Sequence, residues 1–251
     1  MYTRFAYVML PMLTLCGVAW AENDPTTLKS FEETFKGKGK YATSGEIHKG
    51  FDTPYWALSL TGDAAAELSE VGLKLSNEGD DGLSQAVLTR HIGCGSFEEV
   101  IHLHNFALGP LKGSPADSFA QLILIHTTDS GGHFQITFIE NDRIKNSWWM
   151  SVIQDGQLLS WRESKKLSTS VEAGKDIALK VSWDQEDKRV SIVYDRDTKT
   201  DKNRKVTLAE FKYAGAPMLE GSVSLILQRM NKGGSSAATL THWQVAPAKK
   251  K

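Results

Sequence analysis

The stretch IALKVSWDQEDKRVSIVY, residues 177–194, contains two runs of alternating apolar and polar residues separated by a polar turn. Apolar residues fall at every second position from Ile177 to Trp183, and again from Val190 to Tyr194. A side-chain period of two is that of a β-strand with one buried face. The four residues between the runs, Gln185-Glu186-Asp187-Lys188, are typical of a turn. The stretch therefore predicts an antiparallel hairpin with one dry face.

The same kind of pattern recurs along most of the chain. Phe134–Phe138 alternates in this way, and Ala120–Ile125 is apolar at nearly every position, as expected of a central strand covered on both faces. Only Asp63–Glu70, DAAAELSE, looks helical, and it is short. Further strands are expected at Phe31–Phe35, Gly72–Ser76, Ala86–Arg90, Val100–Phe106, Ser147–Gln154, Leu158–Glu163, Ser222–Arg229 and Thr239–Val245. The predicted fold is all-β: two packed antiparallel sheets in a β-sandwich (jelly roll), with at most one or two short helices.

Composition excludes several classes of protein. The chain has 251 residues, with 29 Lys and Arg against 30 Asp and Glu, so it carries no basic surplus for nucleic acid or an anionic membrane. A hydrophobic fraction of 41% is enough for a packed core. Two cysteines cannot form a disulfide scaffold or a cysteine-rich zinc module.

The first 21 residues, MYTRFAYVMLPMLTLCGVAWA, have the pattern of a secretory signal peptide. Arg4 is the only charge, an apolar run follows, and Ala19-Trp20-Ala21 supplies small residues before a cleavage point. We therefore expect residues 22–251 to be a single exported domain, secreted or periplasmic, with no membrane contact after cleavage. That domain keeps one cysteine, Cys94, which is expected to be a small buried thiol.

The order of the predicted strands carries a family resemblance. The opening Phe31–Gly37 (FEETFKG) and the later Val71–Leu75 (VGLKL) precede the long middle strands, and Lys180–Asp195 forms a late hairpin. Ser222–Gln228 and Leu240–Val245 form a closing pair, the second of which would return beside the first strand. This order resembles the concanavalin A-like lectin/glucanase jelly roll, the superfamily that includes laminin-G-type modules. The resemblance implies a protein that binds carbohydrate or acts on a polysaccharide.

The enzyme interpretation depends on paired carboxylates. Glucanases of this superfamily carry three acidic residues at alternate positions of one strand, where one attacks and one protonates. The best local match begins at Glu140-Asn141-Asp142, but its third carboxylate would fall at Ile144 or Lys145. We favour a chain turn at Asn141-Asp142. A glycoside hydrolase or polysaccharide lyase with an unrecognised acid/base pair remains the alternative function.

His102-Leu103-His104 is the most specific short motif. On a strand the two imidazoles would lie on the same face, where they could share a metal with a third ligand such as His126. The spacing is similar to that of α-carbonic anhydrases, but the third ligand position of that family corresponds here to Ile123. We therefore predict no metal site, and interpret both histidines as polar groups on the wetter face of a sheet.

Aromatic residues suggest a sugar-binding face. Trp148-Trp149 puts one indole on each face of its strand, and Trp161 and Glu163 follow on the next predicted strand. An aromatic face combined with polar tips suits a sugar, whose C–H face is apolar and whose hydroxyls need hydrogen-bond partners. The prediction is an exported lectin-like protein that binds a glycan on the concave face of one sheet. The predicted carbohydrate-binding residues are His102, His104, Trp148, Trp161 and Glu163.

Two acidic segments are candidate calcium sites, although no cofactor is predicted. They contain Asn77, Asp80 and Asp81, and Asp195, Asp197 and Asp201, respectively. Neither fits a calcium-loop pattern, so both are interpreted as solvated turns, with calcium kept as an option. A structural or adhesion module with a protein partner is the third functional hypothesis. It predicts an exposed apolar patch and no groove.

Overall fold

The computed structural model describes residues 27–41, 45–46, 56–78, 83–93, 95–108, 119–127, 133–141, 147–154, 157–163, 175–195, 205–212, 221–230 and 235–249. The expected signal peptide, residues 1–21, and Cys94 lie outside this set. Over the described ranges, the chain contains no helix with the length and apolar character needed to cross a membrane.

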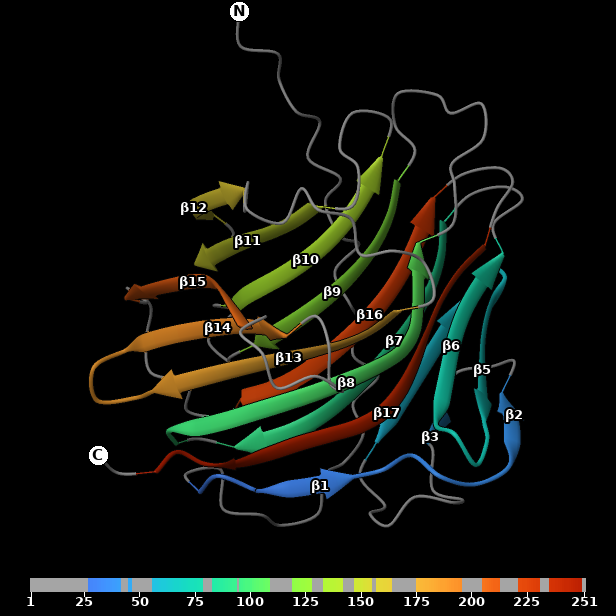
Figure 1. The fold of residues 1–251 in the computed structure, drawn as a ribbon, viewed down its shortest axis with the longest axis horizontal. Helices are drawn as coiled ribbons and strands as arrows, with labels where there is room; N and C mark the ends of the chain where they lie inside the picture. Colours follow the sequence, from blue (N-terminus) through green and yellow to red (C-terminus); the bar gives the residue numbers. More distant parts are fainter. Residues whose placement is uncertain are drawn as a thin grey trace, which may run out of the picture.

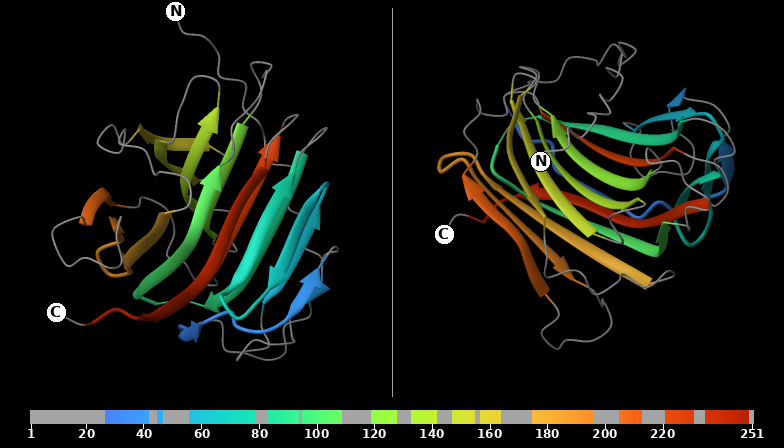
Figure 2. Two further views of the ribbon diagram at one scale, coloured as in Figure 1. Left: turned by 45° about the vertical axis from the view of Figure 1, so that its right-hand side comes forward. Right: turned by 90° about the horizontal axis from the view of Figure 1, so that it is seen from above.

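The described residues form seventeen strands in two antiparallel sheets, stacked as the layers of a sandwich (Figures 1 and 2). The nine-stranded sheet has the order β15-β14-β13-β8-β17-β6-β5-β2, with β1 also paired to β17. Its strands are β1 (Phe31–Glu33), β2 (Gly39–Tyr41), β5 (Ala64–Leu68), β6 (Leu73–Glu78), β8 (Phe97–Leu108), β13 (Lys175–Asp184), β14 (Arg189–Asp195), β15 (Lys205–Lys212) and β17 (Ser235–Pro247). The predicted all-β sandwich is confirmed.

The eight-stranded sheet has the order β12-β11-β10-β9-β16-β7-β4-β3. Its strands are β3 (Gly45–Glu46), β4 (Ala57–Thr61), β7 (Leu83–Gly93), β9 (Phe119–Thr127), β10 (His133–Asn141), β11 (Ser147–Gln154), β12 (Gln157–Glu163) and β16 (Gly221–Met230). Each of its neighbouring strand pairs is antiparallel. In each sheet, the inner face is the one turned toward the other sheet, and the outer face is the one turned away from it.

The hairpin that decided the fold class is β13–β14. Val181 pairs with Ile192 and Trp183 with Val190, so the buried residues of the two strands face the same layer. Asp184 Oδ1 accepts hydrogen bonds from the backbone N–H groups of the next turn residues, at 3.0 and 3.2 Å. An aspartate that caps its own turn in this way holds the reversal in place.

The closing pair is divided between the two sheets. β17 returns beside the first strand, with Phe31 opposite Val245, as expected. β16 lies instead in the eight-stranded sheet, between β7 and β9. The chain therefore crosses from one layer to the other between its last two strands.

The segment Asp63–Glu70 is a strand and not a helix, which corrects the prediction. β5 buries Ala64, Ala66 and Leu68 and leaves Ala65 and Glu67 exposed. Alanine has a high intrinsic helix propensity, and that suggested a helix. The period-two burial against the core outweighs this small preference.

Strand β9 is buried on both faces, as its continuous apolar run predicts. Leu122 and Leu124 belong to the main core between the sheets. Ile123 and Ile125 belong to a second hydrophobic cluster, on the outer face of the eight-stranded sheet. That outer face is therefore apolar at its centre, whereas the outer face of the nine-stranded sheet is largely polar along β8 and β13.

Candidate functional site

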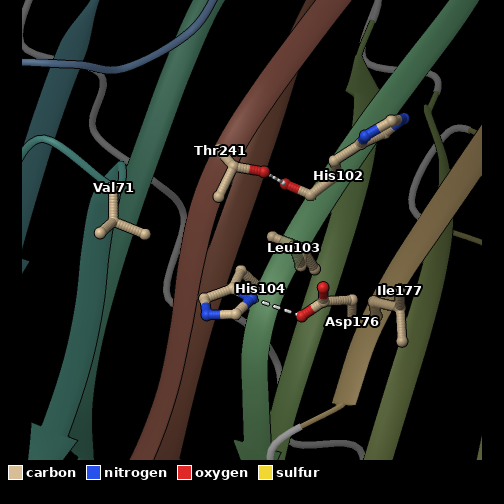
Figure 3. Close-up of a pocket in the computed structure, with 7 residues that line it drawn as sticks. All are labelled: Val71, His102, Leu103, His104, Asp176, Ile177 and Thr241. Atoms are coloured by element: carbon tan, nitrogen blue, oxygen red, sulfur yellow. Dashed lines mark hydrogen bonds and ion pairs between the residues drawn. The ribbon is translucent and has the colours of Figure 1, made fainter. Parts of the chain in front are cut away.

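A shallow pocket of about 190 Å³ lies on the outer face of the nine-stranded sheet, where β13, β8 and β17 run side by side (Figure 3). Two of the five predicted site residues contribute to it. It is lined by Val71, His102, Leu103, His104, Asp176, Ile177 and Thr241.

Two β-bulges shape this pocket. The first is on β8, where the register with both neighbouring strands shifts around Asn105, a residue with φ of +52°. The second is on β17 between Leu240 and His242, so that Thr241 and His242 both lie on the outer face, while Leu240 and Trp243 are buried. Bulges redirect side chains and are common beside functional sites.

An aspartate and a histidine form the polar centre of the pocket. Nδ1 of His104 lies 2.5 Å from Oδ1 of Asp176, and the backbone N–H of Asn105 donates to the same oxygen at 3.4 Å. The His104 side chain is 47% exposed and that of Asp176 28% exposed. Figure 3 shows the second carboxylate oxygen pointing away from the His104 ring. Asp176 therefore holds the imidazole through one oxygen, and its other oxygen points away from the ring.

His102 belongs to a different contact on the same face. Its ring centroid is 5.2 Å from that of His242 on β17, with an interplanar angle of 66°. In Figure 3 the rings of His102 and His104 point in different directions and lie apart along β8. The two histidines of the His-x-His motif thus share a face of the sheet, but each contacts a different partner.

One wall of the pocket is apolar. Val71 is 56% exposed and lies in the turn before β6. The turn is closed by the Ser69 backbone N–H, which donates to the Gly72 carbonyl at 3.0 Å. A Cβ on Gly72 would lie 2.4 Å from the Leu240 carbonyl oxygen, so only glycine allows this turn to lie against β17.

The predicted site residues do not lie on one sheet. His102 and His104 are on β8 of the nine-stranded sheet, whereas Trp148 on β11 and Trp161 and Glu163 on β12 are in the eight-stranded sheet. The expected single concave face carrying all five residues is therefore not formed. The reason is that alternation within a strand does not specify which sheet the strand joins, and β8 and β11 join different sheets.

The backbone register also places the predicted site residues of β11 and β12 in two different alternations of the eight-stranded sheet. Glu163 pairs with Trp149, and this row continues through Thr137 to Ile123, a residue of the outer-face cluster. Trp161 lies two positions from Glu163 and therefore shares its alternation.

Trp148 occupies the opposite alternation. It pairs with Phe138, which pairs with Leu122 of the main core. In the backbone register, Trp149 and not Trp148 falls in the same alternation as Trp161 and Glu163.

The third histidine considered for a metal site lies between the sheets. His126 is fully buried, its Nε2 lies 2.6 Å from Oε2 of Glu99, and its ring stacks on Phe97. Oε1 of the same glutamate accepts a hydrogen bond of 2.6 Å from the Trp243 indole N–H. His126 therefore cannot complete a site with His102 and His104, which lie on the outer face.

Of the candidate calcium ligands, only the side chain of Asn77 is described, and its Oδ1 is buried without a hydrogen-bond partner. Asn77 is buried, and its amide donates to backbone carbonyls of Leu227 at 3.2 Å and Ser84 at 3.5 Å. Among the described side chains, no group of three or more His, Cys, Asp or Glu converges in a way that could hold a metal ion. The other candidate calcium ligands, Asp80, Asp81, Asp197, Asp201 and the side chain of Asp195, lie outside the described set.

Sequence reasoning missed four residues of this surface: Val71, Asp176, Thr241 and His242. Asp176 was outside the predicted strand, and Thr241 and His242 share a face only because of a bulge. Alternation alone could not place Thr241 and His242 on one face, since a bulge breaks the period of two on which it relies.

No protein-family model and no curated protein sequence matches this chain. Solved structures do match its fold. The exoplasmic/lumenal domain of VIP36 in its Ca²⁺/Man2-bound form is 14% identical, with a TM-score of 0.56 over 89% of this chain and 90% of that one. The legume lectin-like domain from Entamoeba histolytica is 9% identical, with a TM-score of 0.53 over 78% and 91%.

The lectin UEA-II complexed with galactose is 8% identical, with a TM-score of 0.53 over 87% of this chain and 98% of that one. A sialidase structure also matches, with a TM-score of 0.52, but this chain covers only 19% of it. The chain therefore has the concanavalin A-like lectin fold, as the order of its strands predicts.

Proposed function

We propose that this chain is an exported carbohydrate-recognition protein that binds a glycan without changing it chemically. The observation that carries the proposal is the fold, which matches lectin domains over nearly their whole length. Two of those proteins were solved with a bound sugar, VIP36 with Man2 and UEA-II with galactose. The signal-peptide pattern of residues 1–21 supports export.

The pocket has the chemistry that a sugar ring requires. Val71 offers an apolar wall for the C–H face of a sugar, and the free Asp176 oxygen can accept hydrogen bonds from hydroxyl groups. Thr241 adds a hydroxyl, which also donates to the His102 carbonyl at 3.3 Å. The pocket is smaller than the roughly 300–1,000 Å³ of sites for drug-sized ligands, so it would hold a single ring.

Charge favours neutral or amino sugars at this pocket. None of its lining residues is Lys or Arg, whereas Asp176 supplies a carboxylate. A uronic acid or sulfated sugar would bring a second negative charge close to Asp176, and like charges at short range repel.

Trp161 and Glu163, with Trp149 in the same alternation, form a second candidate surface on the other sheet. The proposal for these residues comes from their residue types and register: an aromatic next to a carboxylate is a common arrangement at a sugar site. Trp148 remains a predicted site residue, although its register row leads to the main core.

Hydrolysis is the weaker proposal. Glycoside hydrolysis uses two carboxyl groups separated by about 5–9.5 Å across the scissile bond. Asp176 is the one carboxylate that lines the described pocket. Hydrolysis would need a second carboxyl group beside Asp176, whereas sugar binding needs only the groups that line the pocket. We therefore keep hydrolase activity as the alternative.

The test is saccharide binding by the exported form of the chain, measured by calorimetry with methyl α-mannoside, methyl β-galactoside, glucosamine and glucuronic acid. We expect binding of a neutral or amino sugar that survives EDTA. Asp176→Asn should weaken it about 10- to 150-fold, because a ligand hydrogen bond to a charged group is worth about 1.5–3 kcal/mol. Lys180→Ala is the matched control, since Lys180 lies on the same face in an exposed ion pair with Glu98.

The outcomes separate the function from the site. Binding that Trp161→Ala removes and Asp176→Asn leaves intact would move the site to β12. The absence of binding to all four sugars and to a glycan array would contradict the proposed function. Release of reducing sugar from a bound oligosaccharide would establish the alternative.

A further inference from the structure

The carboxylate–imidazole pair at the centre of the pocket involves only one of the two ring nitrogens of the histidine. Nδ1 of His104 lies 2.5 Å from Oδ1 of Asp176. In Figure 3, Nε2 of His104 lies on the side of the ring away from Asp176. Because the His104 side chain is 47% exposed, the ring can exchange a proton with the solvent while Asp176 holds it in place.

The protonation state of this ring decides the charge of the pocket. Asp176 is the one carboxylate among the lining residues, and none of them is Lys or Arg. With neutral imidazoles the pocket therefore carries one negative charge, and a protonated His104 would cancel it. Histidine is the side chain that most readily changes its charge between pH 5 and pH 8.

A ligand bound to Asp176 would lie within reach of a charge on His104. The Asp176 oxygen that points away from the ring is the one placed to accept a hydrogen bond from a ligand. A ligand atom bonded to it would lie within about 8 Å of the imidazole, because the other oxygen of the same carboxylate contacts Nδ1. That distance does not exceed the Debye length in physiological salt, so a protonated His104 would repel a cation held by Asp176.

The neighbouring strands on one side of His104 add little net charge. In the register of the sheet, His104 lies opposite Thr239 of β17, which lies opposite Lys74 of β6. Lys74 is in turn opposite Glu67 of β5, and both side chains are exposed on the outer face. Opposite charges directly across two strands attract and partly offset each other.

The remaining charged and titratable groups of this face are grouped with partners of their own. On β13, Lys180 forms an ion pair of 2.9 Å with Glu98. His102 also lines the pocket, but its ring contacts that of His242, whose Nε2 lies 3.2 Å from Oε1 of Glu32. His102 is therefore the second histidine whose titration an experiment on this pocket must separate from that of the carboxylate-bound ring.

We propose, resting on the function proposed above, that the ligand of this pocket is an amino sugar and that protonation of His104 releases it. While the imidazole is neutral, the protonated amino group of the sugar binds the Asp176 carboxylate. A protonated imidazole repels that amino group and favours a sugar carboxylate in its place. Binding and protonation are then linked, and the linkage is reciprocal: an amino sugar that binds must displace protons, and an acidic sugar must take them up.

The proposal is tested by calorimetry of the exported form of the chain between pH 5 and pH 8. The probes are glucosamine, methyl 6-amino-6-deoxy-α-glucoside, glucuronic acid and the neutral methyl α-glucoside. The amino group of the second probe stays protonated throughout, because alkylamines titrate near pH 10. We expect an amino sugar to bind about three- to tenfold more weakly at pH 5 than at pH 8, as for like-charge repulsion at a half-exposed site. Titrations in two buffers of different ionisation enthalpy should show proton release on binding of the amino sugar.

Matched variants assign the effect to one histidine. His104→Asn, whose amide can still donate to Asp176, should reduce the ratio of affinities at the two pH values to that of methyl α-glucoside. His102→Asn and Lys74→Gln are the controls and should keep the ratio, with far-UV circular dichroism at both pH values to confirm that each variant is folded.

The outcomes distinguish this proposal from the function on which it rests. Sugar binding that is equal at pH 5 and pH 8, that releases no protons, or that is as tight for methyl α-glucoside as for the amino sugars would overturn the proposal and leave sugar binding established. A ratio that disappears in His102→Asn and persists in His104→Asn would also overturn it. The absence of binding by every probe at both pH values would contradict the proposed function, and this proposal with it.

Discussion

Glu99 joins the two sheets through hydrogen bonds in the centre of the sandwich, and its replacement by leucine should destabilise the fold strongly. The glutamate lies on β8, is fully buried, and contacts His126 of the opposite sheet and Trp243 of its own sheet at 2.6 Å each. Leucine would fill a similar volume but could accept neither bond. Each buried donor that loses its partner costs about 1–3 kcal/mol, so Glu99→Leu should cost about 2–6 kcal/mol.

The assay is urea unfolding followed by tryptophan fluorescence, with the free energy of unfolding taken from the midpoint and slope. Glu98→Leu is the control, since Glu98 is the next residue but lies on the outer face in an exposed pair with Lys180. Its loss should cost less than about 1 kcal/mol.

A double variant provides the sharper test of the same interaction. Replacing both Glu99 and His126 by leucine removes both members of this buried hydrogen-bonded pair. Apolar replacement of both members of a buried pair is often tolerated. We therefore expect the double variant to be less destabilised than the sum of the two single variants. A loss of less than 1 kcal/mol in Glu99→Leu, or strictly additive effects, would refute the assignment of the bridge.

Two further predictions concern the backbone around the pocket. Gly72→Ala should lower the free energy of unfolding by about 1–3 kcal/mol, because the new Cβ would meet the Leu240 carbonyl oxygen at 2.4 Å. Its control is Val71→Ala at the exposed neighbouring position, which should change the free energy of unfolding by less than about 0.5 kcal/mol. Asn105→Gly should be tolerated and Asn105→Val should cost about 1–3 kcal/mol, since φ at this position is +52°. Thermal unfolding of the four variants side by side checks both, and equal melting temperatures for the glycine and valine variants at position 105 would contradict the second.

Local alternation predicted the strands well where they are regular. The hairpin at Ile177–Tyr194 and the two-sided burial of β9 followed directly from residue type, because a strand's side-chain period is fixed by its backbone. The prediction is wrong at Ala64–Leu68, where the alanines favour a helix and the segment is a strand because alternate residues are buried against the core. It also missed β15, at Lys205–Lys212, whose start lies in a highly charged stretch.

The candidate site was less accessible to sequence reasoning. His102 and His104 were correctly placed on one strand, but their partners Asp176 and His242 were not identified. These partners come from strands far away in the chain, and His242 faces His102 only through a bulge.

The fold class of this protein is readable from its residues, because period-two patterns along most of the chain predict a sheet fold and the order of strands predicts the lectin-like jelly roll. The tertiary structure decided which strands are neighbours. That choice depends on long-range pairing and on which of two layers each strand joins, and neither is encoded in local alternation. This pairing of strands places the predicted tryptophans and histidines in different sheets, and it brings His104 next to Asp176 and His102 next to His242.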